Sequence, residues 1–172
     1  MLRLAFVLLV AAALQERDAP EYEIKAAFLY NFATFVDWPS STFPDEGSPF
    51  LVGVLGQDPF GPALEEAFKG KTVHQRRIVV RRSLEMGDLV TCHLLFVCAS
   101  ERERAPMILD FLKGMPMLKV GDFPGFAAIG GCIDFFIEGR KVRFEINPEA
   151  PKRVNLKVSS KLLRLARVVA EK

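Results

Sequence analysis

The sequence is poor in the residues that most often carry catalysis and metal binding. Its 172 residues include two histidines, three cysteines and one tryptophan. It contains no CxxC or HExxH motif, no GxSxG elbow, no GxxxxGK[ST] phosphate loop and no GxGxxG dinucleotide turn. These absences remove the usual signatures of zinc enzymes, serine hydrolases, P-loop NTPases and nicotinamide-dependent oxidoreductases. We therefore expect no catalytic residues, no cofactor and no metal site.

A large excess of charge of one sign is also missing. The chain has 23 Lys and Arg against 21 Asp and Glu, a formal net charge of +2. A balance this close to neutral gives no reason to expect a nucleic-acid partner. Residues 69–82 and 152–172 are nevertheless locally basic, with Glu171 as their single acid. These segments either meet an acidic partner or an anionic ligand, or they are two ordinary solvated faces.

Cysteine is too scarce for a disulfide scaffold. An odd number of cysteines leaves at least one thiol free or paired between chains. Cys92 and Cys98 fall in one expected strand, about 20 Å apart at about 3.3 Å per residue. A disulfide needs Cα atoms within about 7 Å, so any bridge within the chain must use Cys132. The alternative is that all three are small buried apolar residues.

Long apolar runs are missing after the first residues. Arg3 precedes the run Leu4 to Ala13, which ends in three alanines. A spanning helix needs about 20 apolar residues, so this run is too short to cross a bilayer. A charged start, a short apolar stretch and small residues at its end predict a cleaved signal peptide over residues 1–13, and hence export from the cytoplasm. The alternative is a buried first strand or a wrongly assigned start of the sequence.

Half of the residues are hydrophobic, with 15 phenylalanines, which indicates a globular core. The length suits one domain, over residues 21–170. An apolar helix is expected over residues 21–37 and is either central to the core or docked on a partner. Strands and helices then alternate, which predicts a single three-layer α/β domain. The expected strands are 50–55, 78–80, 92–99 and 117–120, the helices are 58–70, 100–112 and 160–170, and the hairpin strands are 133–137 and 141–146.

The sheet should be mostly parallel, because the run over residues 92–99 is apolar without alternation, as in a strand covered on both faces. The C-terminal hairpin should then form an antiparallel pair at one edge. His93 lies inside this run and should be a core histidine, while His74 should be exposed. For the helix after the run we expect a capping box of Ser100 and Glu103. Its inner face should consist of Met107, Ile108, Phe111 and Leu112.

The segment Gly121–Gly131 combines glycines with Phe123 and Phe126 and follows a predicted strand. The carboxyl edge of an open α/β sheet is where ligands usually bind. One interpretation is a recognition loop for a partner or a small ligand. The other is that both phenylalanines fold inward as a plug under the sheet.

Three blocks in this order resemble the YfiR family of bacterial periplasmic proteins. They are EIKAAFLYNFATFVDWP at residues 23–39, VGDFPGFAAIGG at residues 120–131 with the hairpin after it, and RFEINP at residues 143–148 followed by VSSKLLRLAR at residues 158–167. The resemblance extends over residues 21–169, although no single block is a catalytic signature.

The resemblance implies regulation. YfiR-like proteins are periplasmic repressors that bind the periplasmic sensor domain of a membrane-bound diguanylate cyclase, and loss of this hold raises cyclic-di-GMP and biofilm formation. Relatives also accompany sensor kinases, and homodimers are common. For this chain we therefore predict a non-enzymatic regulator and a homodimer. The alternative is a periplasmic small-molecule sensor that acts with a sensor kinase, with an anionic or aromatic ligand beside the basic residues.

The family's redox behaviour depends on two disulfides, whereas this chain has three cysteines. Three cysteines allow at most one bridge within the chain, so the family's two-bridge switch is excluded in the monomer. Cys92 matches a family cysteine best and Cys132 less well, which makes these two the candidate redox residues. For partner contacts, aromatic anchors with a basic rim are typical of an interface. On that basis the predicted contact residues are Phe123, Phe126, Lys157 and Lys161.

Overall fold

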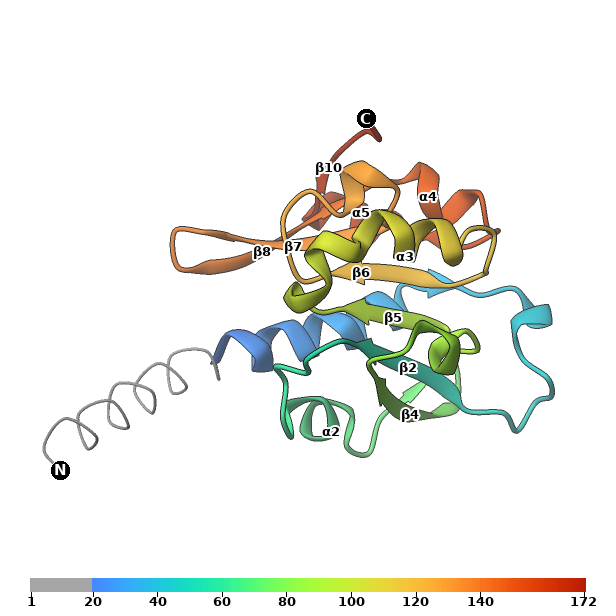
Figure 1. The fold of residues 1–172 in the computed structure, drawn as a ribbon. Coiled ribbons are helices and arrows are strands. Elements are labelled where there is room, and N and C mark those ends of the chain that lie inside the picture. The colour runs from blue at the N-terminus through green and yellow to red at the C-terminus, as the bar shows by residue number, and fades with distance from the viewer. Residues whose placement is uncertain (1–19) are drawn as a thin grey trace, which may run out of the picture.

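The computed structural model describes residues 20–172 (Figure 1). The predicted signal peptide over residues 1–13 lies outside the described residues. The first described element is a helix over residues 20–34. The other α-helices are α2 (Ala63–Phe68), α3 (Ala105–Phe111), α4 (Glu149–Lys152) and α5 (Ser160–Leu165). Short 3-10 helices are η1 (Ser40–Thr42), η2 (Met86–Leu89), η3 (Ala99–Arg104) and η4 (Ala127–Ile129).

One eight-stranded sheet organises the molecule. Its strands are β2 (Phe50–Leu55), β3 (Thr72–Val73), β4 (Arg76–Ser83), β5 (Leu94–Val97), β6 (Leu118–Gly121), β7 (Ile133–Glu138), β8 (Lys141–Ile146) and β10 (Arg167–Val168). Their order is β10-β8-β7-β6-β5-β2-β4-β3, and only the pairs β7–β8 and β3–β4 are antiparallel. The predicted mostly parallel sheet with a hairpin at one edge is confirmed. The two-residue strand β10 is the one strand that lies beyond the hairpin, at that edge of the sheet.

Each face of the sheet has its own hydrophobic core, which gives the predicted three layers. The helix over residues 20–34 packs on one face together with α2 and α5, and α3 packs on the other. Strand β2 shows how the sheet serves both cores, because successive side chains of a strand point to opposite faces. Phe50, Val52 and Val54 enter the first core, whereas Leu51 and Leu55 enter the second.

The helix over residues 20–34 is part of the core of this single chain. Leu29 and Phe32 are completely buried, and Phe28 packs on the hairpin rings Phe135 and Phe144 at centroid distances of 6.0 and 5.3 Å. The helix ends before the predicted residue 37, because β1 (Val36–Asp37) pairs with β9 (Lys157–Val158) in a separate two-stranded sheet.

Two expected helix starts are wrong. The Oδ1 atom of Asp58 accepts a hydrogen bond from Phe60 N at 2.9 Å, but this closes only a turn, and α2 begins at Ala63. The predicted capping box does not form. Ser100 Oγ instead accepts a hydrogen bond from Gln57 N at 3.0 Å, and residues 99–104 form η3. The α-helix begins only at Ala105, with a proline in its first turn, where a missing N–H costs little.

The expected inner face of α3 is half wrong. Ile108 and Leu112 are buried as predicted, whereas Met107 and Phe111 are 54% and 49% exposed. Because the helix is short and starts at Ala105, its buried stripe includes Ala105, Ile108 and Leu112, which are three to four residues apart.

The last helix is also shorter than predicted. It ends at Leu165, which is 67% exposed, and the chain continues as β10, parallel to β8. Val169 N donates to Ile146 O at 2.9 Å in this edge pairing. The outer edge of β8 has unpaired backbone groups that can form hydrogen bonds with a further strand. A longer α5 would gain little from burial, because Leu162 is its one buried residue, so the chain pairs with β8 instead.

Candidate functional site at the carboxyl edge of the sheet

Three neighbouring parallel strands, β2, β5 and β6, end at one edge of the sheet. Backbone hydrogen bonds join the segments that follow them: Cys98 N donates to Leu55 O at 3.0 Å, and Asp122 N donates to Val97 O at 2.9 Å. Figure 1 shows that the hairpin β7–β8 projects from this edge and that the described part of the first helix begins there. This edge therefore gathers segments that are distant in sequence.

A buried ion pair joins the first helix to this edge. Lys25 is 4% exposed, and its Nζ lies 2.7 Å from Asp122 Oδ1, with Glu21 as a second carboxylate partner. Tyr22 donates its hydroxyl to Asp122 Oδ2 at 2.9 Å. Burial raises the pKa of Asp122, although Lys25 and Tyr22 favour the charged carboxylate and act against this shift. The arrangement fixes the helix to the end of β6.

A groove runs between the first helix and α2. Its volume is about 740 Å³, which is within the range of small-molecule sites. Tyr22 and Phe60 contribute aromatic rings that meet edge to face at 5.4 Å. The groove also has acidic side chains, Glu23, Asp58 and Glu66, and one lysine, Lys71. It is thus an aromatic groove with a mainly acidic rim.

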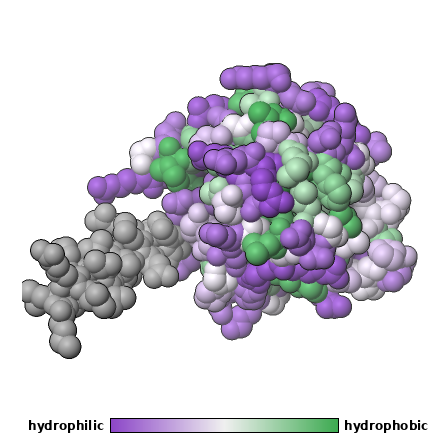
Figure 2. Space-filling model, viewed as in Figure 1, coloured by the Kyte–Doolittle hydropathy of each residue, from purple (hydrophilic) through white to green (hydrophobic). Residues whose placement is uncertain are grey.

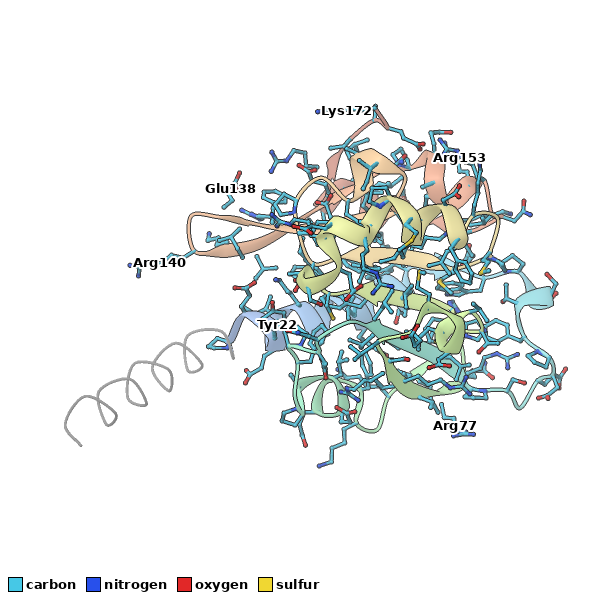
Figure 3. All side chains as sticks on the ribbon, viewed as in Figure 1. Tyr22, Arg77, Glu138, Arg140, Arg153 and Lys172 are labelled. Carbon is cyan, nitrogen blue, oxygen red and sulfur yellow. The ribbon has the colours of Figure 1, made fainter. Side chains whose placement is uncertain are left out.

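An apolar strip lies on the projecting hairpin, which the first helix contacts through Phe28. Ile137 is two residues beyond the buried Phe135, so both side chains point to the same face of β7. Ile137 is 50% exposed and pairs with the half-buried Val142, while Ile24 on the first helix is 47% exposed. We call Ile24, Phe28, Ile137 and Val142 the hairpin face. Figure 2 shows apolar side chains on the hairpin, and Figure 3 shows Tyr22, Glu138 and Arg140 at this side of the molecule.

The thiols are poorly suited to covalent chemistry. All three cysteines are buried and free. Burial raises the pKa of Cys92 to about 11 and also raises the pKa values of Cys98 and Cys132, so the thiols stay protonated near neutral pH. In residues 20–172 there is no group of three or more His, Cys, Asp or Glu side chains that could hold a metal ion.

The two candidate redox cysteines, Cys92 and Cys132, form no bridge. Cys92 belongs to the core under α3, whereas Cys132 belongs to the core under the first helix. The sheet separates the two cores, so a bridge between these residues would require a change of fold. Three buried free thiols, the other interpretation of the sequence, are what the structure contains.

His93 is the core histidine that the sequence predicts. It is 4% exposed, and its Nδ1 accepts a hydrogen bond from Leu51 N at 3.0 Å. Its ring stacks on Phe43 and Phe50 at centroid distances of 4.4 and 5.0 Å. Burial lowers the pKa of His93, which keeps the ring neutral. His74 is exposed, as predicted.

The loop over residues 121–131 places its two aromatic rings inside the protein. Phe123 and Phe126 are 3% and 0% exposed and meet edge to face at 5.5 Å. A side chain at Gly121 or Gly131 would collide with the ring of Phe126, which explains both glycines. This is the inward plug that we stated as the alternative. Contact of these rings with a partner stays a prediction and would require the loop to open.

The predicted basic rim does not lie with the aromatic loop. Lys157 is exposed on β9, next to the end of the first helix, and Lys161 is exposed in the first turn of α5. Neighbouring residues of both lysines pack into the core under the first helix, whereas Phe123 and Phe126 belong to the opposite core. The four predicted contact residues therefore do not form one site.

Sequence reasoning missed the Lys25–Asp122 pair and the hairpin face. The pair joins residues 97 positions apart, and no local pattern connects them. The hairpin face had a usable signal, because Ile137 and Val142 flank the expected turn, where no core could reach them.

The geometry defines a class of protein: a three-layer α/β domain whose exposed features are grooves and an apolar projecting hairpin. No helix within residues 20–172 has the length and apolar character needed to cross a membrane. A family model described as YfiR/HmsC-like matches residues 22–167. The chain belongs to this YfiR/HmsC-like family, which is a regulatory, periplasmic and non-catalytic family.

Two solved structures share the fold at low sequence identity. The ABC domain in complex with L-Trp from Streptococcus pneumonia matches with a TM-score of 0.51 and 9% identity, over 69% of this chain and 55% of its own. A conserved domain protein from Vibrio cholerae O1 biovar El Tor matches with a TM-score of 0.50 and 10% identity, over 69% and 54%. The chain spans just over half of each, and the likeness concerns the fold alone.

Proposed function

We propose that this protein is a periplasmic regulator that inhibits a membrane-bound diguanylate cyclase by binding its periplasmic sensor domain. The observation that carries the proposal is the family match over residues 22–167, which spans nearly all of the described domain. The buried, protonated thiols and the neutral core histidine add support, because neither supplies a nucleophile or a base.

Inhibition by binding is a population shift. A cyclase with active and inactive conformations responds only to a partner that binds the inactive one more tightly, and equal affinity shifts nothing. The regulator itself needs no chemistry and no nucleotide. It needs a surface that recognises one state of the sensor domain.

We propose the hairpin face as that surface. Ile24 and Ile137 expose apolar area on this face, and the charged residues Arg140 and Lys141 lie at the tip of the same hairpin. Clusters of exposed apolar side chains with a polar rim are typical of interaction sites. The exposed Lys157 and Lys161 remain candidate contacts, at a second position on the same side of the sheet.

Binding to purified sensor domains tests this proposal. The probes are the periplasmic domains of a diguanylate cyclase and of a sensor kinase encoded beside this chain. We expect micromolar or tighter binding to the cyclase domain and at least a tenfold loss for Ile137→Arg. Leu84→Arg is the matched control, because Leu84 is 61% exposed but far along the sheet, after β4.

Binding to the kinase domain alone would overturn the cyclase as the target. Equal binding by Ile137→Arg and the wild type would overturn the hairpin face. Lys157→Glu with Lys161→Glu tests the second position, where a loss of binding would move the interface to β9 and α5. The proposed homodimer is checked by light scattering of the same samples.

A further inference from the structure

A second lysine, Lys119, is buried like Lys25 but has no carboxylate partner in the described part of the chain. Lys119 lies on β6 and is 6% exposed. Its neighbours Leu118 and Val120 enter the core under the first helix, so its side chain points to the opposite face, where α3 lies. Among residues 20–172 its ammonium group makes no hydrogen bond within 3.5 Å and no ion pair within 4.0 Å. An ammonium ion removed from water without a counter-charge is costly.

The ammonium group of Lys119 opens into a pocket. Asp134 Oδ1 is the one fully enclosed, unpartnered side-chain oxygen or nitrogen of the described residues, so Lys119 Nζ keeps some accessible surface. Lys119 lines a pocket of about 450 Å³ between α3, the loop over residues 121–131 and α4. Burial lowers the pKa of Lys119, the Cys132 thiol acts against this shift, and no carboxylate contributes to it.

The walls of this pocket are largely apolar. They include Pro106 and Leu109 from α3, Ile129 from the loop, and Ala150 and Val154 from the α4 region. Ile129 is 46% exposed, as expected for a side chain beside an open pocket. Four exposed charged residues, Asp110, Lys113, Arg153 and Glu171, complete the lining at the rim. Lys119 is the buried charged group of the pocket, and a buried ammonium group beside apolar walls fits a ligand with one negative charge and an apolar body.

The contacts of the C-terminal residues Glu171 and Lys172 show that the mouth of the pocket accepts a carboxylate. Glu171 Oε2 lies 2.6 Å from Arg153 Nη1 and 3.3 Å from Asn147 Nδ2, so a carboxylate of the chain itself already sits at the mouth. Lys172 N donates to Ala128 O at 2.9 Å, which holds the tail against the loop. Figure 3 shows Arg153 and Lys172 at the same side of the molecule.

We propose that this pocket binds a small carboxylate with an apolar body, with Lys119 as its counter-ion. The carboxylate pairs with the unpartnered ammonium, and the apolar body lies along Pro106, Leu109 and Val154. Inorganic phosphate fits less well, because it has no apolar body to pack along these walls. The tail carboxylate of Glu171 competes for Arg153 at the mouth.

The pocket lies on the α3 face, whereas the hairpin face lies on the opposite side of the sheet. The inference therefore does not rest on the proposed cyclase partner, and the two can fail separately. The inference gives the alternative function, a small-molecule sensor, a specific binding pocket. This pocket is separate from the basic segment over residues 69–82 and from Lys157.

Calorimetric titration of the purified protein tests the site. The probes are benzoate, hexanoate and 3-phenylpropionate, each paired with its neutral amide, and inorganic phosphate. We expect at least one carboxylate to bind at least tenfold more tightly than its amide and than phosphate. Lys119→Met should weaken this binding at least tenfold, and Glu171→Gln should strengthen it by releasing Arg153.

Three results would overturn the proposal: none of the three carboxylates binds, an amide binds as tightly as its acid, or Lys119→Met binds as the wild type does. Lys113→Met is the matched control, since this exposed lysine also lines the pocket. Far-ultraviolet circular dichroism and the unfolding midpoint of each variant separate a lost ligand from a lost fold.

Discussion

The two faces of the sheet each bury one lysine, and they treat it differently. Under the first helix, Lys25 is surrounded by Asp122, Glu21 and the ring of Tyr22, whose centroid lies 4.6 Å from Nζ. Under α3, Lys119 is buried to a similar degree and has no carboxylate partner. A buried charge with partners holds a structure together, whereas one without partners weakens it. The first lysine is therefore explained by the fold, and the second requires an explanation from function.

The largest expected effect is at the paired lysine. Lys25→Met leaves the Asp122 carboxylate buried without its cation, which typically costs about 3–5 kcal/mol of unfolding free energy. Urea unfolding monitored by circular dichroism measures this loss. Combining Lys25→Met with Asp122→Leu should recover most of it, because no charge is then left buried. A loss below about 1 kcal/mol for the single variant would show that the pair is not structural.

The plug on the α3 face should be nearly as sensitive. Phe126→Ala removes a fully buried ring and should cost about 3–5 kcal/mol. Phe111→Ala is the control on the same face, since its half-exposed ring should cost less than about 1 kcal/mol. Equal losses for the two variants would mean that the loop does not anchor its ring in the core.

These comparisons also show what the sequence can predict. Strand β2 spans the predicted residues 50–55. A short, continuous apolar run between two polar loops is typical of a buried strand, so its position could be predicted. The central strand β5 was predicted for the same reason, whereas the hairpin was predicted from its turn at residues 138–139 and from the alternation of apolar and charged residues over residues 142–146. The short helices were not, since α2 begins after the turn at Asp58 and α5 gives way to β10, and both outcomes depend on contacts with distant strands.

The site was less predictable than the fold. The sequence around Phe123 and Phe126 does not show whether the two rings are exposed anchors or a buried plug. The outcome depends on whether the glycines of the loop leave space for a ring to turn inward. Asp122 meets Lys25 only through tertiary packing. Lys119 did have a signal that we did not use: a lysine inside the short apolar strand expected at 117–120, in a sheet expected to be covered on both faces.

A smaller effect concerns Asp134 on β7, whose side chain holds the loop over residues 121–131. Its Oδ2 accepts a hydrogen bond from Ala127 N at 2.8 Å, while burial raises the pKa of its carboxyl to about 6. The folded protein then binds a proton that the unfolded chain releases near pH 3.8, so stability falls as the pH rises from about 4 to 6. The total change is about 3 kcal/mol at most.

Asp134→Asn removes this titration. The difference in unfolding free energy between the variant and the wild type should therefore grow in favour of the variant from pH 4 to pH 6 and stay constant above that. Urea unfolding at intervals of half a pH unit measures the difference. A difference that does not change with pH would show that the carboxyl is ionised throughout.

The smallest expected change in unfolding free energy is at Lys119, the lysine without a carboxylate partner. Its replacement should raise the stability, whereas replacement of Lys25 should lower it. Lys119→Met should leave the protein as stable as the wild type or more stable, by about 1–2 kcal/mol at pH 7, because no partner charge is left behind. Burial lowers the pKa of Lys119, so the folded state releases its proton before the unfolded chain does. The wild type should therefore approach the variant in stability as the pH rises toward 10.5.

Cyclic-di-GMP in living cells tests the central claim, regulation of a membrane-bound cyclase, most directly. Deletion of the gene for this chain should raise cyclic-di-GMP several-fold. Expression of the wild type or of Leu84→Arg should restore the low level, and expression of Ile137→Arg should not. An unchanged cyclic-di-GMP level in the deletion strain, under conditions where the neighbouring cyclase is expressed, would contradict the account.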